Sequence, residues 1–194
     1  MLSLDLSINT MQLKSTKADI DAKVSEVRDF DTLFNTHWDK VYGVVYRIVG
    51  DPSEAEDLAL ESFLKLHQRP PRRKTNLSGW LYRVATNLAF NALRSRKRRT
   101  AYETAAGKHI LETKSPINPG EAVERTEACR RVREVLSKMK GRSARILILR
   151  HSGLSYAEIA RAVGVADSSV GTLLSRAEKE FERRYKRSFE MDKW

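Results

Sequence analysis

The 194-residue chain has a single cysteine, Cys129, and four histidines scattered without a pair at metal-ligand spacing. A disulfide framework and a cysteine-rich zinc site therefore cannot form within one chain, and a reducing compartment is the natural setting. No apolar run approaches the ~20 residues that span a bilayer. The N-terminal residues lack the basic start and long apolar stretch of a secretory signal. We expect a soluble, cytoplasmic protein with no membrane insertion, no metal and no cofactor.

The sequence also lacks internal repeats and the alternation of apolar and polar residues that marks half-buried strands. Apolar residues recur instead at helical spacing. Gly107, Pro116, Pro119 and Gly120 give one segment the composition of a linker. We predict an all-α fold of two small helical domains joined by a flexible linker. The predicted parts are an N-terminal extension, flexible or partly helical (1–28), a first domain (29–99), the linker (100–120), a second domain (121–187) and a tail (188–194).

Three helices are predicted in the first domain. Asp51 and Pro52 stand where the N-cap and first turn of the second helix belong. The third helix is expected from about Ser78 to Arg99, with Trp80 in the core. The residues expected on the buried side of the second helix are Ala55, Leu58, Ala59, Phe63, Leu64 and Leu66.

Charge is abundant but unevenly distributed. The net charge of +11 favours a polyanionic partner, because basic side chains on phosphates release condensed counterions. An anionic membrane or ribosomal RNA would satisfy the same balance. Residues 1–66 hold 7 basic and 12 acidic side chains, whereas residues 67–99 hold 10 basic and none acidic. This abrupt change predicts two faces for two different partners.

Residues 154–181 carry the signals of a helix-turn-helix. Ser155 and Glu158 have the spacing of a capping box at a helix start. Gly164 stands where a tight turn needs a positive φ, and Asp167 or Ser168 can cap the following helix. The second helix of such a motif enters the major groove of DNA. A plain helical hairpin in a core is the alternative, and the basic charge of the chain favours DNA binding.

The recognition helix then offers a set of polar and basic side chains to DNA. The residues of this helix expected to contact DNA, with Lys179 on a phosphate and the others in the groove, are Ser168, Ser169, Thr172, Ser175, Arg176 and Lys179. Further candidates for phosphate contacts are Arg145, Arg150, Arg161, Arg183 and Arg184.

Three motifs in fixed order resemble a known family. They are GDPSEAEDLALESFLKL (50–66), LSGWLYRVATNLAFNALRSRKRR (77–99) and the helix-turn-helix. Together they resemble the sigma-70 family of bacterial RNA polymerase sigma factors, in its extracytoplasmic-function (ECF) branch. The resemblance implies an alternative sigma factor, which is not an enzyme. Such a protein binds core RNA polymerase, directs it to specific promoter DNA and assists strand opening, and an anti-sigma factor holds it inactive.

The resemblance also assigns roles to individual residues. It implies that the acidic second helix binds the clamp of the polymerase, and that the loop at residues 69–76 and the third helix hold melted minus-ten DNA. The implied polymerase-binding residues are Asp51, Glu54, Glu56, Asp57 and Glu61. The implied minus-ten residues are Asn76, Tyr82, Arg83, Asn87, Asn91, Arg94, Arg96, Arg98 and Arg99.

The chain departs from the family pattern in its recognition helix. Family members often have basic residues where this chain has Gly171 and Leu173, so fewer charged groups remain for the groove. Three other classes compete with a sigma factor: a dimeric helix-turn-helix regulator, an enzyme acting on nucleic acid and a structural RNA-binding protein. The dimeric regulator leaves the acidic helix and the wholly basic stretch unexplained. The enzyme lacks a carboxylate cluster or phosphate-binding loop, and the RNA-binding protein rests on charge alone.

Overall fold

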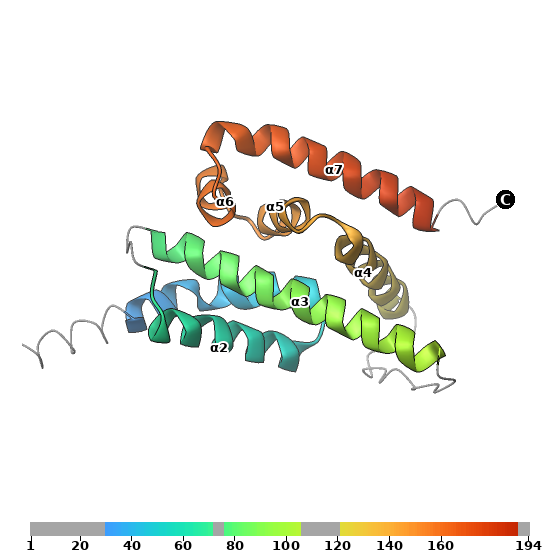
Figure 1. Cartoon of the computed structure of the whole chain (residues 1–194), viewed down its shortest axis with the longest axis horizontal. Coiled ribbons are helices and arrows are strands. Elements are labelled where there is room, and N and C mark those ends of the chain that lie inside the picture. The colour runs from blue at the N-terminus through green and yellow to red at the C-terminus, as the bar shows by residue number, and fades with distance from the viewer. Residues whose placement is uncertain (1–29, 72–75, 106–120, 190–194) are drawn as a thin grey trace, which may run out of the picture. The chain divides into compact units, whose positions relative to one another are not determined.

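The structure is a computed structural model that describes residues 30–71, 76–105 and 121–189. These residues form helices and no strand, in agreement with the predicted all-α fold (Figure 1). A first helix covers residues 30–49. It is followed by α2 (Pro52–Gln68), α3 (Leu77–Ala105), α4 (Glu121–Lys138), α5 (Gly141–His151), α6 (Tyr156–Val163) and α7 (Asp167–Phe189). Residues from Asp39 onward form one unit and residues up to Trp38 another.

The turn between the first helix and α2 follows from its sequence. Val45 and Ile48 are fully buried, and the helix ends at Gly50, which has a φ of +78° that other residues rarely adopt. Asp51 then caps α2, because its carboxylate accepts a hydrogen bond of 2.8 Å from the backbone N–H of Glu54. The predicted start of α2 is therefore confirmed.

Helix α3 is longer than expected. It was predicted to end at Arg99 but runs to Ala105, since no glycine or proline interrupts the sequence before Gly107. The first six residues of the expected linker are thus helical. Helix α7 likewise reaches Phe189, two residues past the expected end of the second domain. The expected extension (1–28) and the rest of the linker and tail lie outside the described residues.

Two apolar residues on these helices lie closer to solvent than expected. Leu64 was predicted on the buried side of α2 but is 51% exposed, while Phe63 and Leu66 fill the core beside it. The buried stripe of α2 is narrower than its apolar pattern suggested, because the main contact of α2 with the labelled helices is with α3. Trp80, expected in the core, is half-buried.

The helix-turn-helix forms as predicted. The hydroxyl of Ser155 accepts a hydrogen bond from the Glu158 backbone N–H, and the Glu158 carboxylate accepts one of 2.8 Å from the Ser155 backbone N–H. Gly164 ends α6 with a φ of +76°. Val170 and Leu174 of α7 are buried against the helices beneath. None of the described helices is long and apolar enough to span a membrane.

Helix α3 occupies a central position in the unit that begins at Asp39. It packs against α2 on one side and against α6 on another, and α5 and α6 in turn pack against α7 (Figure 1). The predicted first and second domains are therefore in contact through α3 and α6.

Candidate nucleic-acid and protein interfaces

The outer face of α2 combines carboxylates with exposed leucines. Asp57, Leu60, Glu61 and Leu64 follow one another at intervals of three, one and three residues, so they share one side of the helix. Leu60 is 45% exposed and Leu64 51%. Exposed apolar side chains of this size, rimmed by charge, mark sites of protein association. We call these four residues the α2 outer face. Its leucines were missed at the sequence level, because their spacing also suits a buried position.

The other expected polymerase-binding residues of α2 differ in their contacts. Glu56 is exposed. Asp51 is engaged as the cap of α2. Glu54 forms an ion pair of 3.2 Å with Arg96 of α3, and Arg96 also donates a hydrogen bond of 2.7 Å to the carbonyl of Val49. Asp51, Glu54 and Arg96 thus make their contacts within the first domain.

The N-terminal half of α3 is engaged with α5 and α6. The Asn76 side chain caps α3 by accepting from the Gly79 backbone N–H, and it donates a bond of 3.2 Å to the carbonyl of Arg161. Arg83 donates a bond of 3.0 Å to the carbonyl of Ala162. Arg145 of α5 donates to the hydroxyl of Thr86 and to the side-chain oxygen of Asn87. Three expected minus-ten residues therefore have partners within the chain.

The structure corrects the expectation for Tyr82. Its side chain was expected near melted DNA, but the residue is only 1% exposed. Helix α3 packs against both α2 and α6, so a polar residue on this helix can be buried even when its neighbour in the sequence is a basic residue. A buried ring cannot stack on a base in this arrangement.

Burial of Tyr82 has a consequence that can be measured by titration. Loss of hydration, and then the negative charge of Glu158, raise the pKa of Tyr82 from 10.0 to about 12. Because the folded pKa is the higher one, the stabilisation from neutral Tyr82 is complete below pH 10.0 and is lost as the pH rises through about 12. We expect phenolate absorbance to show a late ionisation near pH 12 that Tyr82→Phe removes. A late step that persists in this variant would contradict the assignment.

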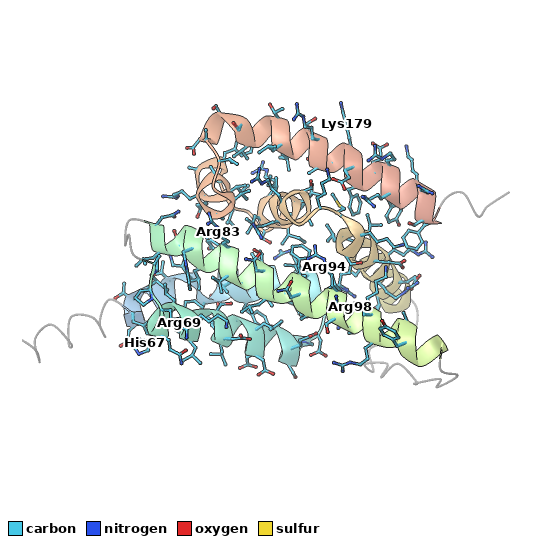
Figure 2. All side chains as sticks on the ribbon, in the orientation of Figure 1. His67, Arg69, Arg83, Arg94, Arg98 and Lys179 are labelled. Carbon is cyan, nitrogen blue, oxygen red and sulfur yellow. The ribbon has the colours of Figure 1, made fainter. Side chains whose placement is uncertain are left out.

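The basic side chains in the C-terminal half of α3 fall into two groups, those with a partner in the chain and those without one among the described residues. Arg94 lies over the ring of Phe90 at 5.7 Å, and Arg96 is held as described above. Lys97 lies 4.0 Å from Glu134 of α4. Arg98 and Arg99 are exposed and have no such partner among the described residues, and Asn91 is also exposed. Figure 2 labels Arg83, Arg94 and Arg98 along this helix.

The polar residues predicted on the recognition helix share its outer side. Thr172, Ser175, Arg176 and Lys179 are exposed at helical spacing, opposite the buried Leu174. Lys179 projects outward from α7 (Figure 2). Ser168 is exposed as well, and Ser169 is half-buried. An unobstructed polar face of this kind suits insertion into the major groove.

Two of the other arginines expected to contact phosphates have partners within the chain. Arg150 lies over the ring of Tyr156 at 5.5 Å, and Arg184 pairs with Glu180 at 3.1 Å. Of the loop at residues 69–76, positions 72–75 lie outside the described residues. Arg69 at its start is exposed (Figure 2). In the described part of the chain, no three His, Cys, Asp or Glu residues gather into a group that could hold a metal ion.

Each of the two helical domains matches a known protein family. Residues 33–99 match the family described as Sigma-70 region 2, and residues 129–181 match Sigma-70, region 4. The chain is 35% identical over 164 residues to the RNA polymerase sigma-H factor of Pseudomonas aeruginosa, covering 77% of this chain and 80% of the relative. It is 27% identical to the ECF RNA polymerase sigma factor SigW of Bacillus subtilis, over 86% of this chain and 94% of the relative.

Two solved structures have the same fold. CnrH, in complex with the cytosolic domain of CnrY, has a TM-score of 0.52 and 16% identity, covering 80% of this chain and 86% of CnrH. The sigma factor RpoE of Bartonella quintana, in complex with the anti-sigma factor NepR, has a TM-score of 0.50 and 21% identity, covering 82% of this chain and 98% of RpoE.

Proposed function

The chain belongs to the sigma-70 family, in its ECF branch, and from this premise we propose that it binds core RNA polymerase and directs it to specific promoters. The first domain docks on the polymerase and holds melted minus-ten DNA, and the second reads the minus-thirty-five duplex. This role requires no covalent chemistry from the chain, and it is carried out on the cytoplasmic polymerase. The observation that carries the proposal is the ordered pair of family matches at residues 33–99 and 129–181.

The α2 outer face supports polymerase docking through this helix. Its leucines supply an apolar centre and its carboxylates a charged rim, which is the usual anatomy of a protein interface. We assign Asp57 and Glu61 as the main charged contacts, with Glu56 beside them. Asp51 and Glu54 act indirectly, since one caps α2 and the other joins it to α3.

Contacts to DNA divide between the two domains. On α3, Arg98 and Arg99 are available to phosphates, and Asn91 to a base or sugar; these groups are exposed. We propose that Asn76, Arg83 and Asn87 join them once α5 and α6 have moved away, and that Arg94 contributes charge. On α7, Thr172, Ser175 and Arg176 face the base edges and Lys179 a phosphate, with Ser168 and Ser169 at the entry to the groove.

An anti-sigma factor is the proposed regulator. Support comes from the two structural neighbours, which were solved with the cytosolic domain of CnrY and with the anti-sigma factor NepR. The chemistry of such a partner follows from the surfaces it would cover, which are acidic and apolar on α2 and basic on α3.

Run-off transcription tests the proposal. Purified core polymerase is incubated with and without the chain on promoter fragments from the genome that encodes it. We expect promoter-specific transcripts only when the chain is present. Salt-sensitive DNA binding by the chain alone, without stimulation of the polymerase, would instead indicate a stand-alone helix-turn-helix regulator.

A further inference from the structure

Helix α3 continues past the part of the chain that matches Sigma-70 region 2. The match ends at residue 99, whereas the helix ends at Ala105. These last residues include Tyr102, which is 76% exposed. No other large apolar residue in the described part of the chain is as exposed. The family match does not reach Tyr102, and the proposed function gives it no role.

Tyr102 ends a stripe of exposed residues along α3. Asn91, Ser95, Arg98 and Tyr102 follow one another at intervals of four, three and four residues, so they lie on one side of the helix. All four are exposed, and we call them the α3 stripe. With a rise of about 1.5 Å per residue, the stripe extends over roughly 17 Å. It therefore continues the surface of α3 that we assign to DNA beyond the end of the family match.

Two cations lie beside Tyr102. Arg98 and Arg99 precede it by four and three residues, which are the spacings of neighbours on a helix surface. Both arginines are exposed and have no partner among the described residues, and Arg98 is labelled toward this end of α3 in Figure 2. The α3 stripe itself contains no carboxylate. Two exposed guanidinium groups without a carboxylate partner favour an anionic ligand, such as a pair of phosphates.

The ring of Tyr102 is free to stack on a ligand. Other exposed or half-buried rings have partners, as Tyr42 and Tyr46 do with centroids 6.1 Å apart, whereas Tyr102 has none among the described residues. Nucleic-acid bases stack on aromatic side chains, and neighbouring cations hold the phosphates of the same strand. In a duplex the faces of the bases are hidden in the stack, so a ring of this kind selects an unpaired strand.

We propose that Tyr102 stacks on a base of single-stranded DNA while Arg98 and Arg99 hold the phosphates next to that base. The stacking tolerates any sequence, because every base has a π-face. The α3 stripe then holds an unpaired strand for about one helical turn beyond the family match. Its use on a melted promoter rests on the proposed function, whereas the binding of a single strand does not.

Two substitutions at Tyr102 separate the ring from its hydroxyl. Tyr102→Leu removes the aromatic face and keeps an apolar side chain that favours a helix, and Tyr102→Phe keeps the ring. Tyr46→Leu is the matched control, because Tyr46 is 42% exposed on the first helix and already stacks on Tyr42. Circular dichroism verifies that all three variants keep their helix content.

Photocrosslinking of the full chain reports on the stacking. The probe is a single-stranded DNA oligonucleotide of mixed sequence with one iodouracil, which light joins to an aromatic ring in contact with it. We expect mass spectrometry to locate the crosslink at Tyr102, both in the chain alone and in the chain bound to core polymerase. Tyr102→Phe should crosslink at the same position. Arg98→Gln together with Arg99→Gln should lower the yield several-fold, because the strand is held less firmly.

Fluorescence anisotropy with the same oligonucleotide, labelled and without iodine, measures affinity. We expect Tyr102→Leu to bind about tenfold more weakly than wild type, a change of about 1.4 kcal/mol that lies within the range for one stacked base. Tyr102→Phe and Tyr46→Leu should bind like wild type. The slope of affinity against salt concentration should stay unchanged in Tyr102→Leu. It should fall by about 1.4 when Arg98 and Arg99 are both replaced by glutamine, at about 0.7 for each phosphate contact on a single strand.

The inference is overturned if the crosslinks of wild type lie at other residues, or if Tyr102→Leu binds the single strand as tightly as wild type. An equal loss of affinity for a duplex of the same sequence, or tighter binding of the corresponding RNA, would overturn it as well. Failure of the proposed function would look different: no core-dependent transcription from any promoter fragment, with the Tyr102 crosslink and the tenfold loss still observed for the chain alone.

Discussion

Reversing two charges on the α2 outer face, by Asp57→Lys together with Glu61→Lys, is expected to abolish binding to core polymerase. Like charges placed against a complementary interface cost several kcal/mol, and each 1.4 kcal/mol is a tenfold change in affinity, so we expect a loss of about a hundredfold or more. The fold should tolerate the change. The new lysine at position 61 would face Lys65 in place of a 3.0 Å ion pair, which costs only about 0.5 kcal/mol in an exposed helix.

The measurement is binding to immobilised or labelled core polymerase, with run-off transcription as a second readout. Glu178→Lys with Glu182→Lys on α7 is the matched control, because it makes the same change in charge at the same spacing and breaks the Glu182–Lys186 pair of 2.7 Å. The control should keep its polymerase affinity. Normal affinity in the α2 variant would show that polymerase docks elsewhere on the chain.

Arg176→Ala in the recognition helix is expected to weaken binding to minus-thirty-five duplex by about 1–3 kcal/mol and to relax its specificity. Gly171 and Leu173 leave this helix with few charged groups toward the groove, so a larger share of base recognition falls on Arg176. Competition between the specific duplex and a scrambled one, measured with each variant, separates affinity from specificity.

Lys179→Ala provides the comparison for Arg176→Ala. Lys179 projects from the same face one turn further along α7 (Figure 2), and we assign it to a phosphate. Its loss should weaken binding to all duplexes alike and lower the slope of affinity against salt concentration by about one. If Arg176→Ala behaves in the same way, Arg176 is a phosphate contact and the bases are read by other side chains.

Features that depend on neighbouring residues were predictable from the sequence. The capping box of Ser155 and Glu158, the left-handed Gly164 and the Asp51 cap each involve residues within a few positions of one another, and all three are confirmed. The all-α fold followed from periodicity in the same way. The end of α3 was placed six residues too early because a basic run was taken as its stop signal, although no glycine or proline lies between Arg99 and Gly107.

Features that depend on distant packing could not be predicted. Leu64 has the spacing of a core residue, and only the placement of α3 leaves it exposed. Tyr82 has the polar group of a ligand-binding residue, yet it is buried. The bonds of Arg83 to Ala162 and of Arg145 to Thr86 join two domains that carry no sequence signal for each other. The functional assignments of the expected residues remain predictions for the experiments above.

The left-handed turn at Gly50 also limits how the joint between the first helix and α2 can change in evolution. Any residue at this position has to hold a φ of +78°, which residues other than glycine rarely adopt. A library of random substitutions at this codon, screened for folded chain, should therefore return glycine far more often than the codons of exposed positions on α2.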